Sequence, residues 1–447
     1  MRRVLVIAYL FPPLGGAGVQ RTVKFVKYLP SYGWEPFVLT VEMGTHITHD
    51  DSLLREIPED VRVYRTKSFD PEDVGGWWRR VFRKNDHPKH MGASTCAKVS
   101  ERHRSRWKDH LSHVYLRALP WVFIPDQKVG WFPDACRVGE RVVKQHHIDL
   151  LFSTSSPVTS HLIALRLKLM SHRPWVADFR DLWVSFPERR PVTSLHGLVE
   201  RAIERWIVTK ADRVIANTEA AQRVFLSDYP TVAPERFITI PNGFDEEDFN
   251  GLSMGNGMIQ LTMTYTGNFY GNRNPLAFFH ALLQLFALQP DLRKEITVRL
   301  IGPEDPSLRP LIHDHHLDEV VEVWPYQPHR KCVEAMASSD VLLLIDAPEF
   351  NVSVPGKVFE YLRVSRPILA LVPEGATAEL LRETGGATIV HPRNVAGIVK
   401  AITDIFSRHV EQKSETVPHS SVVARFERRR LTAQLSGVFN GLIERCE

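Results

Sequence analysis

Short apolar runs alternate with stretches of helical periodicity along almost the whole chain. In the first half, runs rich in aliphatic and β-branched residues predict strands. They lie at 4–9, 37–41, 62–66, 149–155, 175–179, 213–217 and 237–241. Apolar residues that recur every three or four positions predict helices between several of these strands. These stretches are 19–33, 135–147, 158–170 and 197–211.

The alternation starts again after a Gly/Asn/Ser cluster at 251–257, which reads as a linker. Strands are predicted at 258–267, 296–302, 320–325, 340–346, 367–372 and 387–390. Helices are predicted at 274–289, 329–339, 376–385 and 394–410, and one more begins at Lys357.

Apolar strands that alternate with helices are typical of parallel sheets covered on both faces. Two such blocks predict an α/β protein with two doubly wound domains. We place an N-terminal domain at 1–250 and a C-terminal domain at 258–407. The segment 408–447 is expected to form a further helix that packs back on the first domain.

Composition and cysteine use narrow the class of protein. The 447 residues are 43% hydrophobic and 24% charged, as in ordinary globular proteins. The four cysteines lie far apart with no C-x-x-C pair, which argues against a disulfide framework and favours a reducing compartment. The apolar N-terminus ends in Pro-Pro and Gly-Gly, so we interpret it as a strand and not as a signal peptide. No run approaches the roughly 18 apolar residues of a transmembrane helix.

Positive charge is concentrated in one predicted insertion at about 70–125. Between Gly75 and Arg117 eleven Lys or Arg residues stand against three acids, whereas the whole chain has a net charge of only +4. Tryptophan, phenylalanine and tyrosine are interspersed with these cations, which favours contact with an anionic membrane surface. Nucleic acid and a surface insertion without a partner are the alternatives; we expect no nucleic acid.

Candidate ligand-binding residues follow the predicted strands of the second block. In open α/β sheets, ligands bind beyond the carboxyl ends of the strands. Arg273 follows one strand and Lys357 begins a helix after another, so both cations suit a diphosphate. Glu360, one turn after Lys357, could accept from a ribose hydroxyl; an ordinary ion pair between Lys357 and Glu360 is the alternative.

The first block offers a second group of candidates. Gly15 and Gly16 precede a helix, where backbone N–H groups can face an anion, although a tight turn would need glycine as well. His161 could be a base or a buried core histidine. Charged side chains after the strand at 175–179 are either a structural ion pair or acceptor contacts. They are Asp178, Arg180 and Asp181.

Taken in order, several segments resemble the GT-B glycosyltransferases, specifically the large family 4 type that makes bacterial surface polysaccharides. The segments are FPPLGGAGVQRTVKFVKYLPSYGWEPFVLT, IDLLFSTSSPVTSHLIALRLK, PWVADFRDLW, IPNGFDEEDF and SDVLLLIDAPEFNVSVPGKVFEYLRVSRPILA. The resemblance covers nearly the whole length. It implies two Rossmann-like domains that face a cleft, with the donor on the C-terminal domain and the acceptor on the N-terminal one.

The resemblance also implies roles for single residues. Arg273 and Lys357 would hold the diphosphate as catalytic residues, together with His161 and Asp181, and Glu360 would bind ribose. Other donor contacts would come from Gly15, Gly16, Gly267, Asn268, Tyr326, Gln327 and Gly356. Arg180 and Asp178 would lie on the acceptor side. Because two cations can neutralise the diphosphate, we expect neither a metal nor another cofactor.

The resulting expectation is an enzyme that moves a sugar, with retention, from a UDP- or GDP-linked donor to a saccharide or lipid-linked acceptor. It would work in polysaccharide or glycoconjugate biosynthesis, on the cytoplasmic face of the membrane. Val352 stands where many members carry a glutamate, with Glu349 and Asn351 nearby. A nucleotide-sugar 2-epimerase of the same fold and an inactive sugar-nucleotide-binding membrane scaffold remain as alternatives.

Overall fold

The fold is taken from a computed structural model, which describes residues 1–42, 50–69, 124–186, 189, 191–252, 260–269, 272–303, 305–347, 351–411 and 417–444. The predicted basic insertion and most of the predicted linker lie outside the described residues. Two compact units are formed. One contains residues 1–215, 229–236 and 438–447, and the other contains 216–228 and 237–437.

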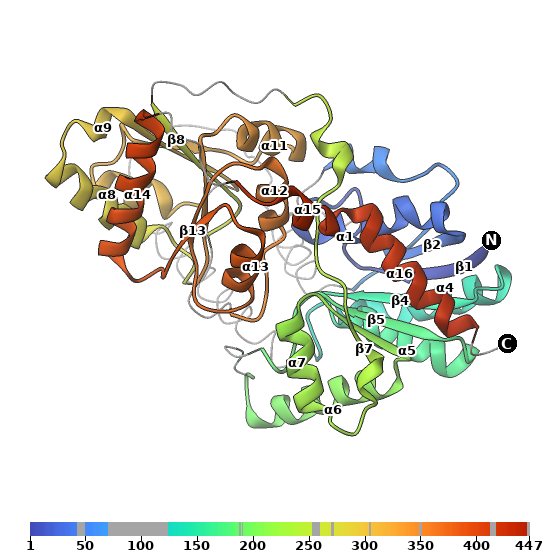
Figure 1. Ribbon diagram of the computed structural model, residues 1–447. Coiled ribbons are helices and arrows are strands. Elements are labelled where there is room, and N and C mark those ends of the chain that lie inside the picture. Colours follow the sequence, from blue (N-terminus) through green and yellow to red (C-terminus); the bar gives the residue numbers. More distant parts are fainter. Residues whose placement is uncertain are drawn as a thin grey trace, which may run out of the picture. The chain divides into compact units, whose positions relative to one another are not determined.

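A seven-stranded sheet with the order β3-β2-β1-β4-β5-β6-β7 organises the N-terminal half (Figure 1). Its strands are β1 Arg2–Ile7, β2 Trp34–Val41, β3 Arg62–Thr66, β4 Leu150–Ser155, β5 Trp175–Phe179, β6 Arg213–Ala216 and β7 Phe237–Thr239. β1 pairs in parallel with β2 and β4. Every residue of β4 and β5 is buried, as expected for strands covered on both faces.

Helices connect these strands, and the four longest of them lie where periodicity predicts helices. They are α1 Ala17–Tyr28, η1 Leu29–Tyr32, η2 Asp51–Glu56, η3 Val129–Trp131, α4 Phe132–Gln145, α5 Thr159–Ser171, α6 Ser194–Lys210, α7 Glu219–Asp228, η4 Pro234–Arg236 and η5 Glu246–Phe249. η1, which directly follows α1, ends at Gly33, whose φ of 84° is the left-handed conformation that glycine adopts without strain. We did not predict α7, although half of its ten residues are apolar.

The second sheet has six strands in the order β10-β9-β8-β11-β12-β13. They are β8 Leu261–Thr266, β9 Ile296–Ile301, β10 Val321–Trp324, β11 Val341–Ile345, β12 Ile368–Leu371 and β13 Ala387–Val390. The pairs β8/β9, β8/β11 and β11/β12 are all parallel. This is the doubly wound, Rossmann-like topology that the sequence predicts, and the prediction of the fold class is confirmed.

Helices cover both faces of the second sheet and build two apolar cores. On one face α8 Leu276–Leu288 and α14 Val395–Val410 lie side by side, with α9 Leu292–Glu295 and α10 Leu308–Asp314 nearby (Figure 1). The other face is covered by α11 His329–Ala337, α12 Lys357–Val364, α13 Ala376–Thr384, α15 Ser420–Val423 and η6 Ala424–Phe426. Burial of these apolar side chains on both faces fixes where each strand ends, and thereby positions the residues that follow.

The chain ends in α16 Arg428–Ile443. Its last residues belong to the first unit, where the indole N–H of Trp34 donates to Oδ1 of Asn440 at 3.1 Å. Phe439 packs edge-on against the same tryptophan, with ring centroids 5.2 Å apart. Among the described residues, none of the helices is both long enough and apolar enough to span a membrane.

Candidate functional site

The strand order of the second sheet reverses between β8 and β11, and the candidate site lies at this point. The first strand of the unit, β8, has β9 on one side and β11 on the other, so connections leave in opposite directions. Ligands bind at such switch points, beyond the carboxyl ends of the strands. Gly267 and Asn268 follow β8, and Asp346 follows β11. The site is therefore built from the connections after β8 and β11, which the sheet brings to one edge.

Arg273 is held at this edge by Asp346. The arginine Nε and Nη2 donate to the same oxygen, Oδ1 of Asp346, at 3.1 and 2.5 Å. Both side chains are buried, and burial raises the pKa of Asp346 although Arg273 opposes the shift. The second oxygen, Oδ2, is buried without a hydrogen-bond partner. We did not single out Asp346, although an acid that ends the apolar run DVLLLID was a usable signal.

Lys357 begins α12 and reaches back to β8. Its Nζ donates to the carbonyl of Thr266 at 2.8 Å and lies 3.6 Å from the ring centroid of Tyr265. Burial, and then the charge of Arg273, hold the pKa of Lys357 well below its usual value. Among the described residues no carboxylate forms an ion pair with this ammonium. Lys357 and Arg273 thus place two nearby cations at the switch point, where Asp346 pairs with Arg273.

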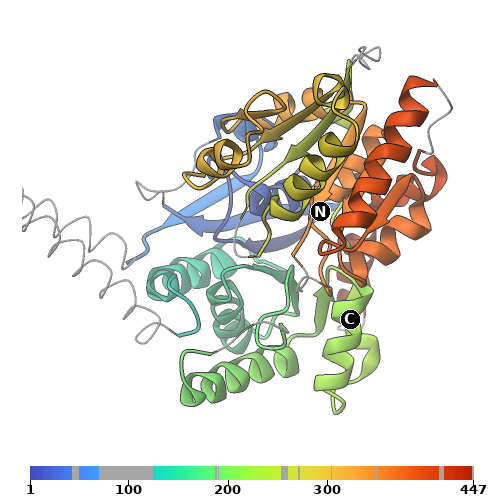
Figure 2. The ribbon, with the colours of Figure 1, turned by 90° about the vertical axis from the view of Figure 1, so that its left-hand side faces the viewer.

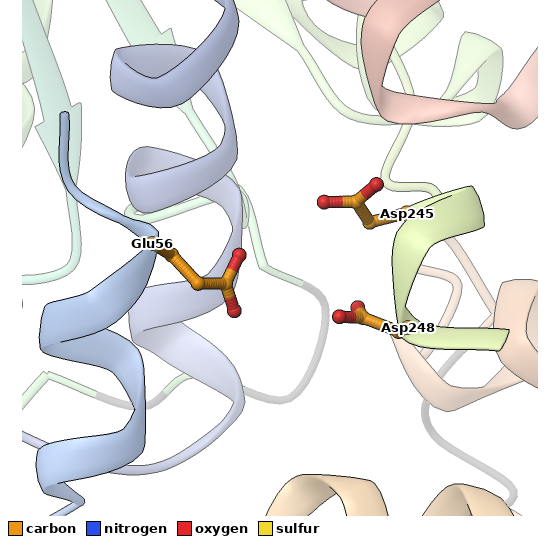
Figure 3. Close-up of side chains that lie close together, drawn as sticks. All are labelled: Glu56, Asp245 and Asp248. Carbon is orange, nitrogen blue, oxygen red and sulfur yellow. The ribbon is translucent and has the colours of Figure 1, made fainter. Parts of the chain in front are cut away.

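Glu360 contacts a histidine rather than Lys357, so the simple ion pair of the alternative reading does not form. His329, the first residue of α11, places Nε2 at 2.8 Å from Oε1 of Glu360. Its Nδ1 lies 3.9 Å from Oδ2 of Asp248, a residue of η5. Asp248 lies in this short helix, and Asp245 caps its N-terminus (Figure 3). Neither His329 nor Asp248 was among the residues that sequence reasoning selected.

Gly267 and Gly356, both predicted donor contacts, differ in backbone conformation and in the space around them. Gly267 has a φ of +120°, a backbone conformation that residues with a Cβ rarely adopt, whereas a Cβ there would make only an ordinary contact with Nζ of Lys357 at 3.4 Å. Gly356 precedes α12, and a Cβ there would meet no atom within 4 Å. Gly356 therefore leaves open space beside the helix start, where a ligand could come close.

Three further donor candidates line the same edge of the sheet. Asn268 accepts a 3.0 Å hydrogen bond from the Tyr265 hydroxyl through its carbonyl. Tyr326 and Gln327 follow β10, and the ring of Tyr326 is 39% exposed. The side-chain Nε2 of Gln327 donates a hydrogen bond to the Pro325 carbonyl at 3.1 Å. Side-chain contacts thus leave Tyr326 accessible for a ligand.

In the first unit, Gly15 and Gly16 precede α1. Gly16 has a φ of 101° and is exposed, and a Cβ there would meet no atom within 4 Å. The turn before α1 therefore needs glycine for its backbone conformation, and it also leaves an open approach. Glu56, which ends η2 of the same unit (Figure 3), pairs with Lys24.

Two of the predicted acceptor-side residues are buried structural groups. Asp178 has no exposed surface and accepts from Nε and Nη2 of Arg21 at 3.0 and 2.8 Å. It also accepts from the Thr154 hydroxyl at 2.8 Å. The ion pair that we considered at this strand end is therefore made with Arg21, and not with Arg180. Arg21 lies in α1, 157 residues earlier, so sequence spacing could not reveal it.

Arg180 joins two loops at the first sheet's switch point, and Asp181 points outward. The guanidinium of Arg180 donates to the carbonyls of Ser155 and Gly18, and burial lowers its pKa. Asp181 is exposed. Of the three charged residues at the end of β5, Asp181 is the exposed one.

His161 lies in the core of the first unit. It has no exposed surface, and burial lowers its pKa to about 3. Nδ1 lies 2.8 Å from the Ser153 hydroxyl, and the ring packs 4.4 Å from that of Phe179. In this conformation His161 contacts only protein and is neutral near pH 7, which favours the core-histidine alternative over a catalytic base.

Two family profiles match the chain, and together they cover more than half of it. The profile described as Glycosyltransferase Family 4 matches residues 79–248, and that of Glycosyl transferases group 1 matches residues 260–408. The chain therefore belongs to the family 4-like glycosyltransferases. This confirms the resemblance seen in the sequence, and with it the class of enzyme, a glycosyltransferase.

Individual relatives are distant. A D-inositol 3-phosphate glycosyltransferase of Kineococcus radiotolerans is 23% identical over 199 residues, which are 41% of this chain and 45% of that protein. The chain thus aligns with less than half the length of this curated relative.

Solved structures show the same fold over the full length. The sucrose-phosphate synthase of Thermosynechococcus elongatus matches with a TM-score of 0.63 and 12% identity, covering 99% of this chain and 100% of that one. HepE of Anabaena, solved in complex with UDP-glucose, matches with a TM-score of 0.60 and 15% identity over 99% and 100% of the two chains. These likenesses confirm the GT-B fold.

Proposed function

We propose that the protein transfers a sugar from a nucleotide-sugar to a saccharide or lipid-linked acceptor, in polysaccharide or glycoconjugate biosynthesis. The observation that carries this proposal is the pair of cations, Arg273 and Lys357, at the switch point of the second sheet. A desolvated ammonium without an ion-pair partner is costly unless an anion joins it. A nucleoside diphosphate supplies that anion.

The chemistry follows from where charge develops. As the bond between the anomeric carbon and the phosphate oxygen breaks, negative charge grows on the leaving diphosphate. Preorganised cations stabilise this charge without reorganisation. Lys357 and Arg273 are in place for that role, and Asp346 fixes the orientation of Arg273. We propose retention of configuration: the acceptor hydroxyl attacks from the same face, and its proton passes to the donor phosphate.

The remaining contacts orient the donor. Glu360 accepts from a ribose hydroxyl, and the backbone around Tyr326 and Gln327 meets the base. HepE is solved with UDP-glucose, which supports a uridine donor, with GDP-linked sugars as the second choice. Two cations replace the divalent metal that would otherwise neutralise the diphosphate, so activity in excess EDTA should equal activity with added magnesium.

The acceptor is assigned to the first unit, where Asp181 is exposed. The basic, aromatic insertion at 70–125 is proposed to bring the enzyme to an anionic membrane on its cytoplasmic side. Deletion of residues 77–108 should lower binding to anionic vesicles at low salt. Undiminished binding by the deletion variant would remove the insertion from the proposal.

A GT-B nucleotide-sugar 2-epimerase is the second candidate. A putative UDP-N-acetylglucosamine 2-epimerase from Listeria monocytogenes shares the fold, with a TM-score of 0.53 and 12% identity. The family profiles favour transfer. An epimerase would convert its nucleotide-sugar without an acceptor and yield a product whose sugar is still bonded to the diphosphate, so net release of nucleoside diphosphate separates the two.

The test is a panel of UDP-, GDP- and dTDP-sugars, with hydrolysis and transfer both measured. Calorimetry with UDP tests the site itself. Lys357→Ala should weaken UDP binding, whereas Arg382→Ala, which removes an exposed cation paired with Glu374, should not. If no donor binds or turns over, and Lys357→Ala changes nothing, the enzyme proposal fails.

A further inference from the structure

Helix α6 of the first unit turns its large apolar side chains outward. It lies at the periphery of that unit in Figure 1 and Figure 2. Leu195 is 69% exposed, Leu198 59% and Trp206 48%. Ala202 is exposed between them. The spacing of three, four and four residues puts all four on one side of the helix. They form a continuous apolar stripe that nothing in the described part of the chain covers.

Cations flank this stripe, and the acids of the same helix point the other way. Arg201, Arg205 and Lys210 are exposed, and no described carboxylate pairs with them. Helical spacing places the two arginines along one edge of the stripe and Lys210 along the other. The outward face of α6 therefore carries only positive charge.

Both glutamates of α6 are used inside the unit. Glu200 is buried and accepts from Nη2 of Arg189 at 2.5 Å. Glu204 is also buried, and accepts from the Val184 N–H at 2.9 Å and from the Tyr229 hydroxyl at 2.7 Å. An ordinary solvated helix face mixes both signs of charge, because such mixtures favour solubility. In α6 the acids face the interior and the cations face outward, and solubility does not explain this distribution.

We infer that the outer face of α6 is a membrane-contact surface, which seats Leu195, Leu198 and Trp206 among the acyl chains and headgroups of an anionic lipid layer. Leucine and tryptophan gain free energy at the acyl boundary, and the flanking arginines and lysine meet the lipid phosphates. The lipid layer is chosen because the cations on both edges of the stripe complement anionic headgroups. This inference rests on the proposed function, and it assigns the proposed membrane contact to a surface among the described residues.

The apolar and the charged contributions can be measured separately in the full-length chain. Leu195→Gln, Leu198→Gln and Trp206→Gln together remove the stripe without a change in charge. Arg201→Gln with Arg205→Gln removes two flanking cations. Leu288→Gln is the matched apolar control, since Leu288 is 74% exposed at the end of α8. Arg309→Gln removes an exposed arginine of α10 as the charge control.

Co-sedimentation with phosphatidylcholine vesicles that contain phosphatidylglycerol gives the readout. Each lost leucine should lower the partition coefficient about tenfold. Each lost arginine should lower it about fivefold, and less at high salt. The two controls should bind as the wild type does. Because all variants keep residues 70–125, that segment contributes equally to each.

Three results would overturn the inference. They are a wild-type chain that ignores anionic vesicles, a stripe variant that binds as tightly as the wild type, and equal binding to pure phosphatidylcholine. Size-exclusion chromatography with light scattering tests the alternative that a second copy of the chain binds this face. A dimer that the stripe variant abolishes would assign the face to that second copy. Vesicle binding needs no donor. Calorimetry with UDP on the same samples therefore tests the proposed donor site separately from the membrane surface.

Discussion

The imidazole of His329 lies 2.8 Å from Oε1 of Glu360, although the two residues stand 31 positions apart in the chain. Both side chains are 20% exposed, so the contact is only partly screened by water. Asp248 lies on the other side of the imidazole, with its Oδ2 3.9 Å from Nδ1. A carboxylate fixed through one oxygen keeps a defined direction for the other, and that oxygen is the one a ribose hydroxyl would meet.

Replacement of His329 should therefore weaken donor binding through Glu360. His329→Ala should cost about tenfold in UDP affinity, the value of one hydrogen bond to a charged group. It should also reduce the preference for UDP over 2′-deoxy-UDP, while inorganic pyrophosphate binds as before. His329→Gln, whose amide can donate to Glu360, should recover part of the loss. The measurement is calorimetry with the three ligands.

The neighbouring Lys331 supplies the control for this helix, since it is exposed and pairs with Glu334 at 2.8 Å. Lys331→Ala should leave all three affinities unchanged. If His329→Ala lowers UDP and pyrophosphate affinity equally, His329 does not act through the ribose, and the positioning role is wrong.

Lys357 should take up a proton when a diphosphate binds. Its pKa is lowered by burial and by Arg273, so part of the free protein carries it neutral once the pH exceeds that lowered pKa. A bound diphosphate favours the charged form and raises the pKa, hence affinity should fall as pH rises. Calorimetry of UDP binding in two buffers of different ionisation enthalpy measures the uptake.

Two variants of Lys357, one that keeps the positive charge and one that removes it, test this prediction. Lys357→Arg keeps a permanent charge, so proton uptake at this site should vanish while binding persists. Lys357→Ala should lose roughly tenfold to a hundredfold in affinity, as for a charge-assisted hydrogen bond. Equal proton uptake by the wild type and the arginine variant would assign the proton to another group.

Removal of one partner of the buried pair Arg273–Asp346 should destabilise the second unit. Arg273 is 8% exposed and Asp346 is 1% exposed. Asp346→Asn keeps the shape but leaves a buried guanidinium unneutralised, at a cost of about 3 kcal/mol or more. Thermal unfolding followed by circular dichroism measures the shift. Glu374→Gln, in the exposed pair with Arg382, should leave the midpoint unchanged; a similar shift in both variants would show that burial does not decide the effect.

His161 should make the first unit sensitive to acid. Its pKa is about 3 in the folded protein, below the ordinary value of 6.5, so the unfolded chain binds the proton more tightly. The stability that the neutral histidine contributes is complete above about pH 6.5 and is lost as the pH falls toward 3. Between pH 7 and pH 5 the loss should be roughly 2 kcal/mol.

His161→Gln tests this by removing the titrating group from the same buried position. The variant is expected to be less stable near pH 7, because packing is disturbed, but its unfolding midpoint should depend less on pH. A pH dependence as steep as that of the wild type would show that other groups govern acid sensitivity.

Local pattern determined most of the architecture. The predicted strands at 62–66, 175–179 and 387–390 coincide with β3, β5 and β13. β5 is buried throughout and leaves an apolar run, whereas the edge strands β3 and β13 are only partly buried and are recognisable by their β-branched residues. The fold class and the family were predicted correctly from this order of elements. Arg273 and Lys357 could be selected because a cation at the start of a helix, after a parallel strand, is visible in sequence. Their roles in binding stay predictions.

Tertiary structure alone decided which groups those residues meet. Asp346 holds Arg273 across 73 positions, His329 holds Glu360 across 31, and Arg21 holds Asp178 across 157. Such partners come from different βα units, and strand order in the sheet, not spacing along the chain, brings them together. For the same reason periodicity showed that α6 is a helix but not which of its faces is buried. That choice depends on where Glu200 and Glu204 find their partners, and it leaves Leu195, Leu198 and Trp206 on the outside.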